Sequence, residues 1–186
     1  VIVYLARADV ALSMSMTALS TLSAIIATPV LTSFFSGSYV SVDAYGLFMS
    51  TLKVVLLPIG IGLILNQFYP IITKRIIPFA PPAAVTLIIF IVASIIGQGK
   101  DIILSSGIQL ILALMLLHFL GFLLGFFICF IVFKNAIVAK TVAIEVGMQN
   151  SGLGVVLAQK NFSHPSVAIP AAISSLIHSL YGSLFV

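Results

Sequence analysis

The sequence contains few charged residues. Of its 186 residues, 6% are Asp, Glu, Lys or Arg and 61% are hydrophobic, and the mean hydropathy is +1.31. A folded soluble domain needs a polar surface that this composition cannot supply, so soluble globular classes are excluded. The Lys and Arg residues form no basic run of the kind that binds nucleic acid, so no nucleic-acid partner is expected. The long apolar runs predict a polytopic membrane protein with the lipid bilayer as partner.

Cysteine and catalytic motifs are also scarce. Cys129 is the only cysteine, which excludes a disulfide framework, and its apolar surroundings predict a packing role. The sequence has no paired aspartates, no Gly-x-Ser-x-Gly and no His-Glu-x-x-His. The sequence therefore offers neither an activated nucleophile nor a set of metal ligands, and we do not expect an enzyme. An intramembrane hydrolase that uses Glu145 and a histidine is kept as the weaker alternative.

Apolar runs separated by short polar segments predict about six crossings, because a helix needs about 20 residues to span a bilayer. Asp9 is placed to cap the first of them, after a remnant at residues 1–6. A proline-rich loop is predicted at residues 70–82, a turn at residues 99–101, and an interruption at Pro170. The predicted spans are residues 10–35, 44–69, 83–98, 108–133, 135–160 and 167–186. The predicted fold is an all-α polytopic membrane protein.

The span at residues 135–160 differs from the others because polar residues stand near its middle. Glu145, Gln149 and Asn150 lie there, with Gly147 between the first two and Gly152 after the last. A carboxylate is costly in hydrocarbon and is tolerated where it faces a cavity, a partner or an ion. The pattern predicts two half-helices joined by unwound backbone, whose free carbonyls can coordinate a cation while the second N-terminus attracts an anion.

Several segments resemble the bile acid:sodium symporter family. They are EVGMQNS at residues 145–151, YLAR at residues 4–7, HSLYGS at residues 178–183 and MSTLKVVLLP at residues 49–58. The resemblance covers essentially the whole chain and implies an inverted-repeat secondary transporter fold with discontinuous crossed helices. In that ten-span fold, residues 1–186 form a single transmembrane domain fragment. It runs from the end of span 4 through span 10, and its broken span lies at about residues 135–160.

The resemblance implies a first sodium site formed by Ser13, Thr17 and Glu145. Ser13 and Thr17 are four residues apart, so their hydroxyls project from one face of a helix. Oxygen ligands of this kind suit a hard cation. Ser and Thr are also common where membrane helices pack closely, so a packing role for both stays open.

A second sodium site is implied on Glu145, the carbonyls of Val146 and Met148, and the side chain of Gln149. Sodium is then a transported ion that occupies two sites. Glu145 as a mere bridge between helices, and Gln149 as a packing residue, stay open as alternatives.

The substrate is expected at the half-helix N-termini, where free N–H groups and the helix dipole favour an anion. Asn150 and Ser151 begin the second half-helix, and the resemblance adds His178 and Ser179. The bile-acid branch has Asn at the position of Ser179. The His-Ser form is closer to the plant plastid members, whose implied substrates are small organic anions such as pyruvate and other 2-oxo acids. His178 as a core residue stays open, and His118 is expected to be a core histidine.

The predicted function is sodium-coupled symport of a small organic anion, either a 2-oxo acid such as pyruvate or a bile-acid-like carboxylate. A passive channel or a receptor on the same scaffold is the alternative. We expect an integral multi-pass protein, in the plastid envelope if it is from a plant and in the plasma membrane otherwise. Because the chain starts at Val1 and shows no signal peptide, we interpret it as part of a longer protein.

Overall fold

The computed structural model of the protein describes residues 2–37, 39 and 41–186. Val1, Ser38 and Val40, which fall in the predicted remnant and first loop, lie outside the described residues. Every regular element in this part of the chain is helical, which confirms the predicted all-α fold. The elements are α1 (Ile2–Leu5), α2 (Val10–Ser36), α3 (Ala44–Phe68), α4 (Pro70–Ile76), η1 (Ile77–Phe79), α5 (Ala80–Gln98), α6 (Lys100–Phe133), α7 (Ala136–Gly147), α8 (Ser151–Asn161), η2 (Pro165–Ala168) and α9 (Ile169–Ser183).

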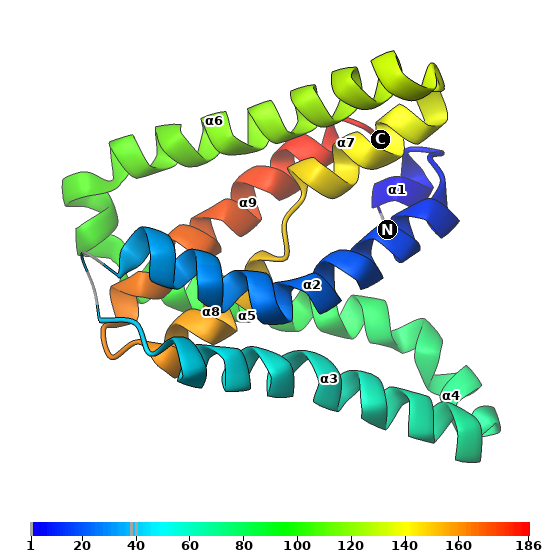
Figure 1. Ribbon diagram of the computed structural model, residues 1–186, viewed down its shortest axis with the longest axis horizontal. Helices are drawn as coiled ribbons and strands as arrows, with labels where there is room; N and C mark the ends of the chain where they lie inside the picture. Colours follow the sequence, from blue (N-terminus) through cyan, green and yellow to red (C-terminus); the bar gives the residue numbers. More distant parts are fainter. Residues whose placement is uncertain (1, 38, 40) are drawn as a thin grey trace.

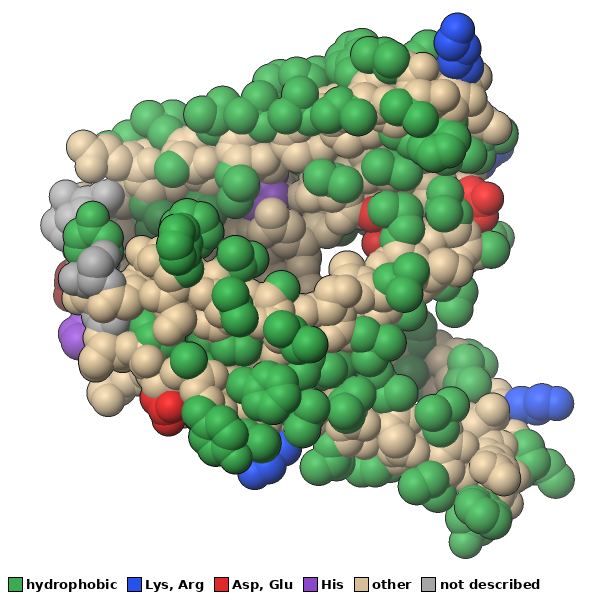
Figure 2. All heavy atoms as spheres, viewed as in Figure 1, with side chains coloured by type: hydrophobic (Ala, Val, Ile, Leu, Met, Phe, Trp, Pro, Cys, Tyr) green, Lys and Arg blue, Asp and Glu red, His purple; other side chains and the backbone are tan. Residues whose placement is uncertain are grey.

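Among the described residues, four helical segments are long and apolar enough to cross a membrane, namely residues 10–36, 44–68, 70–98 and 107–133. Helices α7, α8 and α9 have 12, 11 and 15 residues. At a rise of 1.5 Å per residue they are roughly 16 to 23 Å long, shorter than a hydrocarbon core of roughly 30 Å. Apolar side chains are spread over the face in Figure 2, where most charged side chains lie toward the edges and acidic atoms also appear beside the central hollow. The protein is therefore a multi-pass membrane protein with long and short helices.

Aspartate side chains begin the first two long helices. Asp9 accepts a hydrogen bond from the amide of Leu12 at 3.0 Å, and Asp43 accepts one from the amide of Gly46 at 2.9 Å. Each carboxylate satisfies an amide that has no partner inside the helix. Both helices begin at the predicted residue.

The proline-rich segment at residues 70–82 is helical, so the predicted loop was wrong. Pro70 opens α4, and Pro81 lies in the first turn of α5. Pro170, predicted to interrupt the last span, lies likewise in the first turn of α9. Amides in a first turn have no intrahelical acceptor, so proline loses nothing there. These prolines begin helices.

Helix α6 begins at Lys100, earlier than the predicted start at residue 108. The predicted turn at residues 99–101 is reduced to Gly99, which ends α5 and precedes α6. Asp101 lies in the first turn of α6, where a carboxylate interacts favourably with the helix dipole.

Two glycines let α6 lie close against α7 (Figure 1). A Cβ on Gly125 would stand 3.1 Å from the Cα of Ala143, and one on Gly121 would stand 3.2 Å from the carbonyl oxygen of Val146. Without side chains at these positions, the two backbones approach to van der Waals contact. Cys129, one turn further along α6, is buried as its packing role requires.

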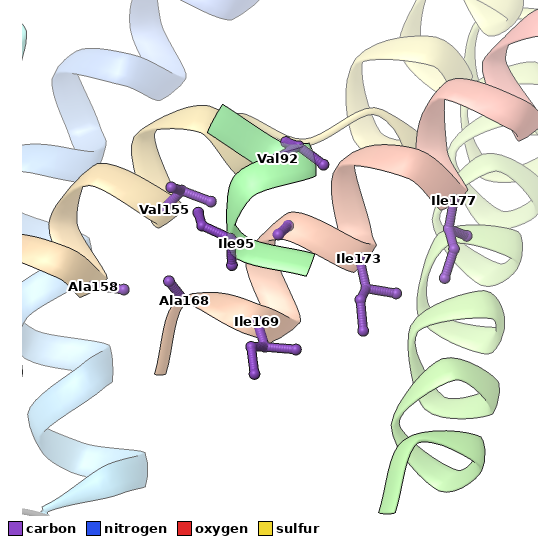
Figure 3. Packing of buried hydrophobic residues seen from close by; sticks show 9 residues of the cluster. Val92, Ile95, Val155, Ala158, Ala168, Ile169, Ile173 and Ile177 are labelled. Atoms are coloured by element: carbon purple, nitrogen blue, oxygen red, sulfur yellow. The ribbon is translucent and has the colours of Figure 1, made fainter. Parts of the chain in front are cut away.

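Two buried clusters hold the two half-helices separately. The larger joins α8 to α5 and α9, with Val92, Ile95 and Val155 packed against Ile169 and Ile173 (Figure 3). The smaller joins α7 to α1 and α6 and consists of Val3, Ala6, Phe122 and Ile144. The segment between α7 and α8 thus connects two half-helices that are each packed in a different hydrophobic cluster.

Candidate functional site

The predicted break in the span at residues 135–160 is present. Helix α7 ends at Gly147, Met148 is extended with φ −93° and ψ 114°, and α8 begins at Ser151. The side chain of Asn150 accepts a hydrogen bond from the amide of Leu153 at 3.2 Å and so caps α8. Neither half-helix is long enough to cross a bilayer, so the break lies within the membrane.

Glu145, in the last turns of α7, receives hydrogen bonds from two hydroxyls of α2. Ser13 Oγ donates to Oε1 at 2.5 Å, and Thr17 Oγ1 donates to Oε2 at 2.7 Å. The structure therefore brings together the first predicted ligand set, with four side-chain oxygen atoms around one place. Both partners are neutral hydroxyls, so neither carries a charge opposite to that of a carboxylate. Oxygen atoms of this kind are suitable ligands for a hard cation.

The start of α2 is anchored to α7 beside this carboxylate. The amide of Asp9 donates to Thr141 Oγ1 at 2.9 Å, and Lys140 Nζ donates to the carbonyl of Ala6 at 3.0 Å. Ser13 lies one turn after Asp9 and Glu145 one turn after Thr141, so both pairs keep the same separation of 132 residues. The two helices run side by side in one direction, and this register delivers the Ser13 hydroxyl to the carboxylate.

A cavity of about 870 Å³ opens at the carboxylate, between helices α2 and α7 and the break. The face in Figure 2 is hollowed between α2 and the layer of α6 and α7. Seven predicted site residues line the cavity: Ser13, Thr17, Glu145, Met148, Gln149, Asn150 and Ser179. The ion and substrate residues thus share one space.

Three predicted site residues lie elsewhere. The carbonyl of Val146 lies against Gly121 of α6. Ser151 and His178 are buried behind the break, where His178 Nε2 and Ser151 Oγ are 3.1 Å apart. Ser179, on the next position of α9, faces the cavity and donates its hydroxyl to the carbonyl of Ser175.

His118 of α6 contacts the break, a position that the sequence analysis did not predict. It was expected to be a core histidine, and it is 1% exposed. Both ring nitrogens are nevertheless engaged by polar groups: Nδ1 lies 2.8 Å from the carbonyl oxygen of Gly147, and Nε2 lies 2.7 Å from Ser174 Oγ. The available signal was an ionisable residue inside a long apolar helix, which is costly in a membrane without polar partners.

Comparison with known proteins agrees with this architecture. Residues 1–106, more than half of the chain, match the Sodium Bile acid symporter family. The chain belongs to this family. This is a family of transporters, which agrees with the prediction that the protein is not an enzyme.

Relatives of this family member occur in plants and bacteria. The chain is 48% identical over 184 residues to a probable sodium/metabolite cotransporter BASS1, chloroplastic, of Arabidopsis thaliana, covering 99% of the chain and 46% of the relative. It is 42% identical over 180 residues to a probable sodium/metabolite cotransporter BASS2, chloroplastic, of Oryza sativa subsp. japonica, covering 97% and 43%. The sodium-dependent transporter YocS of Bacillus subtilis (strain 168) is 38% identical over 184 residues, covering 99% and 57%. The chain thus spans about half the length of these relatives.

Proposed function

We propose that the protein containing these residues couples sodium entry to the transport of a small organic anion across a membrane. The observation that carries the proposal is the carboxylate of Glu145, held by Ser13 and Thr17 beside an unwound segment. A carboxylate with neutral partners at membrane depth is costly, and a bound cation lowers that cost. Sodium suits the hydroxyl and carboxylate oxygens present.

A second sodium ion binds beside the first in this proposal. Met148 and Gln149 line the same cavity as Glu145, and the extended backbone at Met148 frees a carbonyl from helical hydrogen bonding. The shared carboxylate, that carbonyl and the Gln149 side chain form the set, whereas the Val146 carbonyl, which was expected to join it, faces α6. Two cations at one carboxylate leave a net positive site, which favours an anionic substrate nearby.

The substrate carboxylate binds at the N-terminus of α8. Asn150 caps that terminus and lines the cavity, and Ser179 of α9 lines it as well. Free amides and the helix dipole favour negative charge there. Ser151 and His178 support this end of α8 from behind, through the hydrogen bond between them. We propose a 2-oxo acid such as pyruvate as substrate, with a bile-acid-like carboxylate as the other candidate.

The names of the relatives support the sodium coupling. The plant relatives are named sodium/metabolite cotransporters and chloroplastic, and the bacterial one is named a sodium-dependent transporter. In a plant, we therefore propose the plastid envelope as the location. Sodium and anion meet at one break, so each raises the affinity for the other, and movement of one helix bundle against the other carries both across.

Uptake by the full-length protein in liposomes tests this function. Labelled pyruvate, other 2-oxo acids and a bile salt are each offered with a sodium gradient and with potassium in its place. We expect concentrative, sodium-dependent uptake of one class of anion, and its loss in Glu145→Gln. Asp101→Asn, an exposed acid at the start of α6, is the matched control and keeps uptake. Sodium-dependent uptake that survives Glu145→Gln contradicts the mechanism, and uptake that only equilibrates indicates a passive channel.

A further inference from the structure

A chain of hydrogen bonds crosses behind the break and connects its two ends. His118 bonds the carbonyl of Gly147, the last residue of α7, and the hydroxyl of Ser174 on α9. Ser174 Oγ lies 3.0 Å from Ser151 Oγ, on the first residue of α8, and Ser151 continues to His178. All four of these side chains are buried, so water does not compete for their bonds.

The donor and acceptor properties of these groups fix which atom donates in each of the four hydrogen bonds. A carbonyl only accepts, so His118 Nδ1 carries the hydrogen that is donated to Gly147. In a neutral imidazole the other nitrogen then accepts, which makes the Ser174 hydroxyl its donor. Ser174 Oγ in turn accepts from the Ser151 hydroxyl, and Ser151 Oγ accepts from His178 Nε2. The donor in each of these bonds is therefore set by the first bond, in which the Gly147 carbonyl accepts.

His118 takes the place of a missing backbone partner. In an unbroken helix the carbonyl of Gly147 would accept from the amide of Ser151, four residues on. Helix α8 begins at Ser151, so that bond is not made, and an unpaired carbonyl at membrane depth is costly. The imidazole N–H supplies the bond instead. His118 therefore favours the broken form of this span over a continuous helix.

We propose that His118 is a positioning residue that sets the geometry of residues 148–150 and thereby the sodium affinity of the adjoining site. Its ring is held on α6, which packs along α7 through Gly121 and Gly125. Its two nitrogens fix the end of α7 directly and the start of α8 through Ser174. The consequence for sodium rests on the proposed function, whereas the control of the break does not.

The test compares His118 variants in the full-length protein. In His118→Leu, the Gly147 carbonyl loses its donor, and we expect the sodium concentration for half-maximal uptake to rise about tenfold, the effect of one buried unsatisfied polar group. His118→Asn keeps an N–H near the position of Nδ1 and restores the wild-type value. A role in packing alone predicts the reverse, because Leu is the more apolar of the two.

A serine pair on α9 provides a second, milder test. Ser174→Ala removes the link to α8 and raises the half-maximal sodium concentration. Ser183→Ala, whose hydroxyl donates to the carbonyl of Leu180 in its own helix, leaves the value unchanged. If His118→Leu fails to fold, this pair decides the proposal, since equal values for both variants overturn it.

Amide hydrogen exchange separates this proposal from the proposed function. In sodium-free buffer we expect the amides of residues 148–153 to exchange about tenfold faster in His118→Leu than in the wild type, as one lost buried hydrogen bond implies. Amides in the middle of α2 stay unchanged. A wild type without sodium-dependent uptake overturns the proposed function, and the exchange experiment still decides the role of His118. A folded His118→Leu protein with wild-type exchange and sodium affinity overturns the positioning role.

Discussion

At the scale of single residues, the site depends on which hydroxyls reach Glu145. Ser13 and Thr17 each donate to a different carboxylate oxygen, whereas the neighbouring Ser15 donates to the carbonyl of Ala11 in its own helix. The same helix thus carries serines in two environments, one facing the acid and one satisfied locally. Ser15 therefore offers a comparison for Ser13, because a role in helix packing would apply to both serines and a ligand role only to Ser13.

Replacing Ser13 by Ala tests the ligand role. The variant removes one oxygen from the proposed sodium site, and we expect the half-maximal sodium concentration for uptake to rise about tenfold, the effect of one charge-assisted hydrogen bond or ligand. Ser15→Ala is the matched control and keeps the wild-type value. Equal sodium dependence in both variants, with both folded, would assign Ser13 to packing.

At the scale of elements, the break is held open by neighbours on both sides. A Cβ on Gly147 would stand 2.3 Å from the ring of Phe122 on α6, so this end of α7 accepts only glycine without rearrangement. Gly125, on the same helix as Phe122, meets the backbone of Ala143 on α7. Helix α6 is therefore the support against which α7 and its Glu145 are placed.

A glycine pair tests this support. In Gly125→Ala the new methyl group meets the backbone of α7, and we expect a loss of about 1 to 3 kcal/mol in the free energy of unfolding, as overpacking typically costs. Gly62→Ala on α3, where nothing lies within 4 Å of the added Cβ, gains up to about 1 kcal/mol from helix propensity. Thermal unfolding in detergent measures both. A Gly125→Ala protein as stable as Gly62→Ala would show that α6 and α7 are not closely packed.

At the scale of the whole molecule, apolar side chains are exposed along α2, α3, α5 and α6. Lipid or further helices must cover such a surface, and the relatives are about twice as long as this chain. Thr17, Gln149 and Asn150 are exposed within the cavity, so ions, substrate or further spans can reach them.

Sodium binding should also be visible in the stability of the full-length protein. A ligand that binds the folded state raises the free energy of unfolding by about 1.4 kcal/mol at a concentration ten times its Kd. We expect sodium chloride to raise the unfolding temperature relative to potassium chloride, and Glu145→Gln to remove the difference. A sodium effect of the same size in Glu145→Gln would place the ion elsewhere.

Local sequence patterns predicted most of the helices. The Asp9 cap located the start of α2, and the glycines and polar residues around Glu145 located the break. Prolines misled the prediction at residues 70–82 and at Pro170, because a proline marks a helix start as readily as a helix end. The Gly-x-x-x-Gly spacing of Gly121 and Gly125 is a further local signal, since it indicates the close packing of α6 that the structure shows against α7.

The sequence was enough to predict that the chain lies in a membrane, that it is helical, and that one span is broken beside a carboxylate. These follow from composition and from residues close together in the chain, where propensity and the cost of burying charge act. The groups that meet across the break could be identified from the folded arrangement alone. Ser13 and Glu145 are 132 residues apart, and His118 and Gly147 are 29 apart. Such contacts depend on how α2, α6 and α9 pack around α7 and α8, and no local preference encodes that packing.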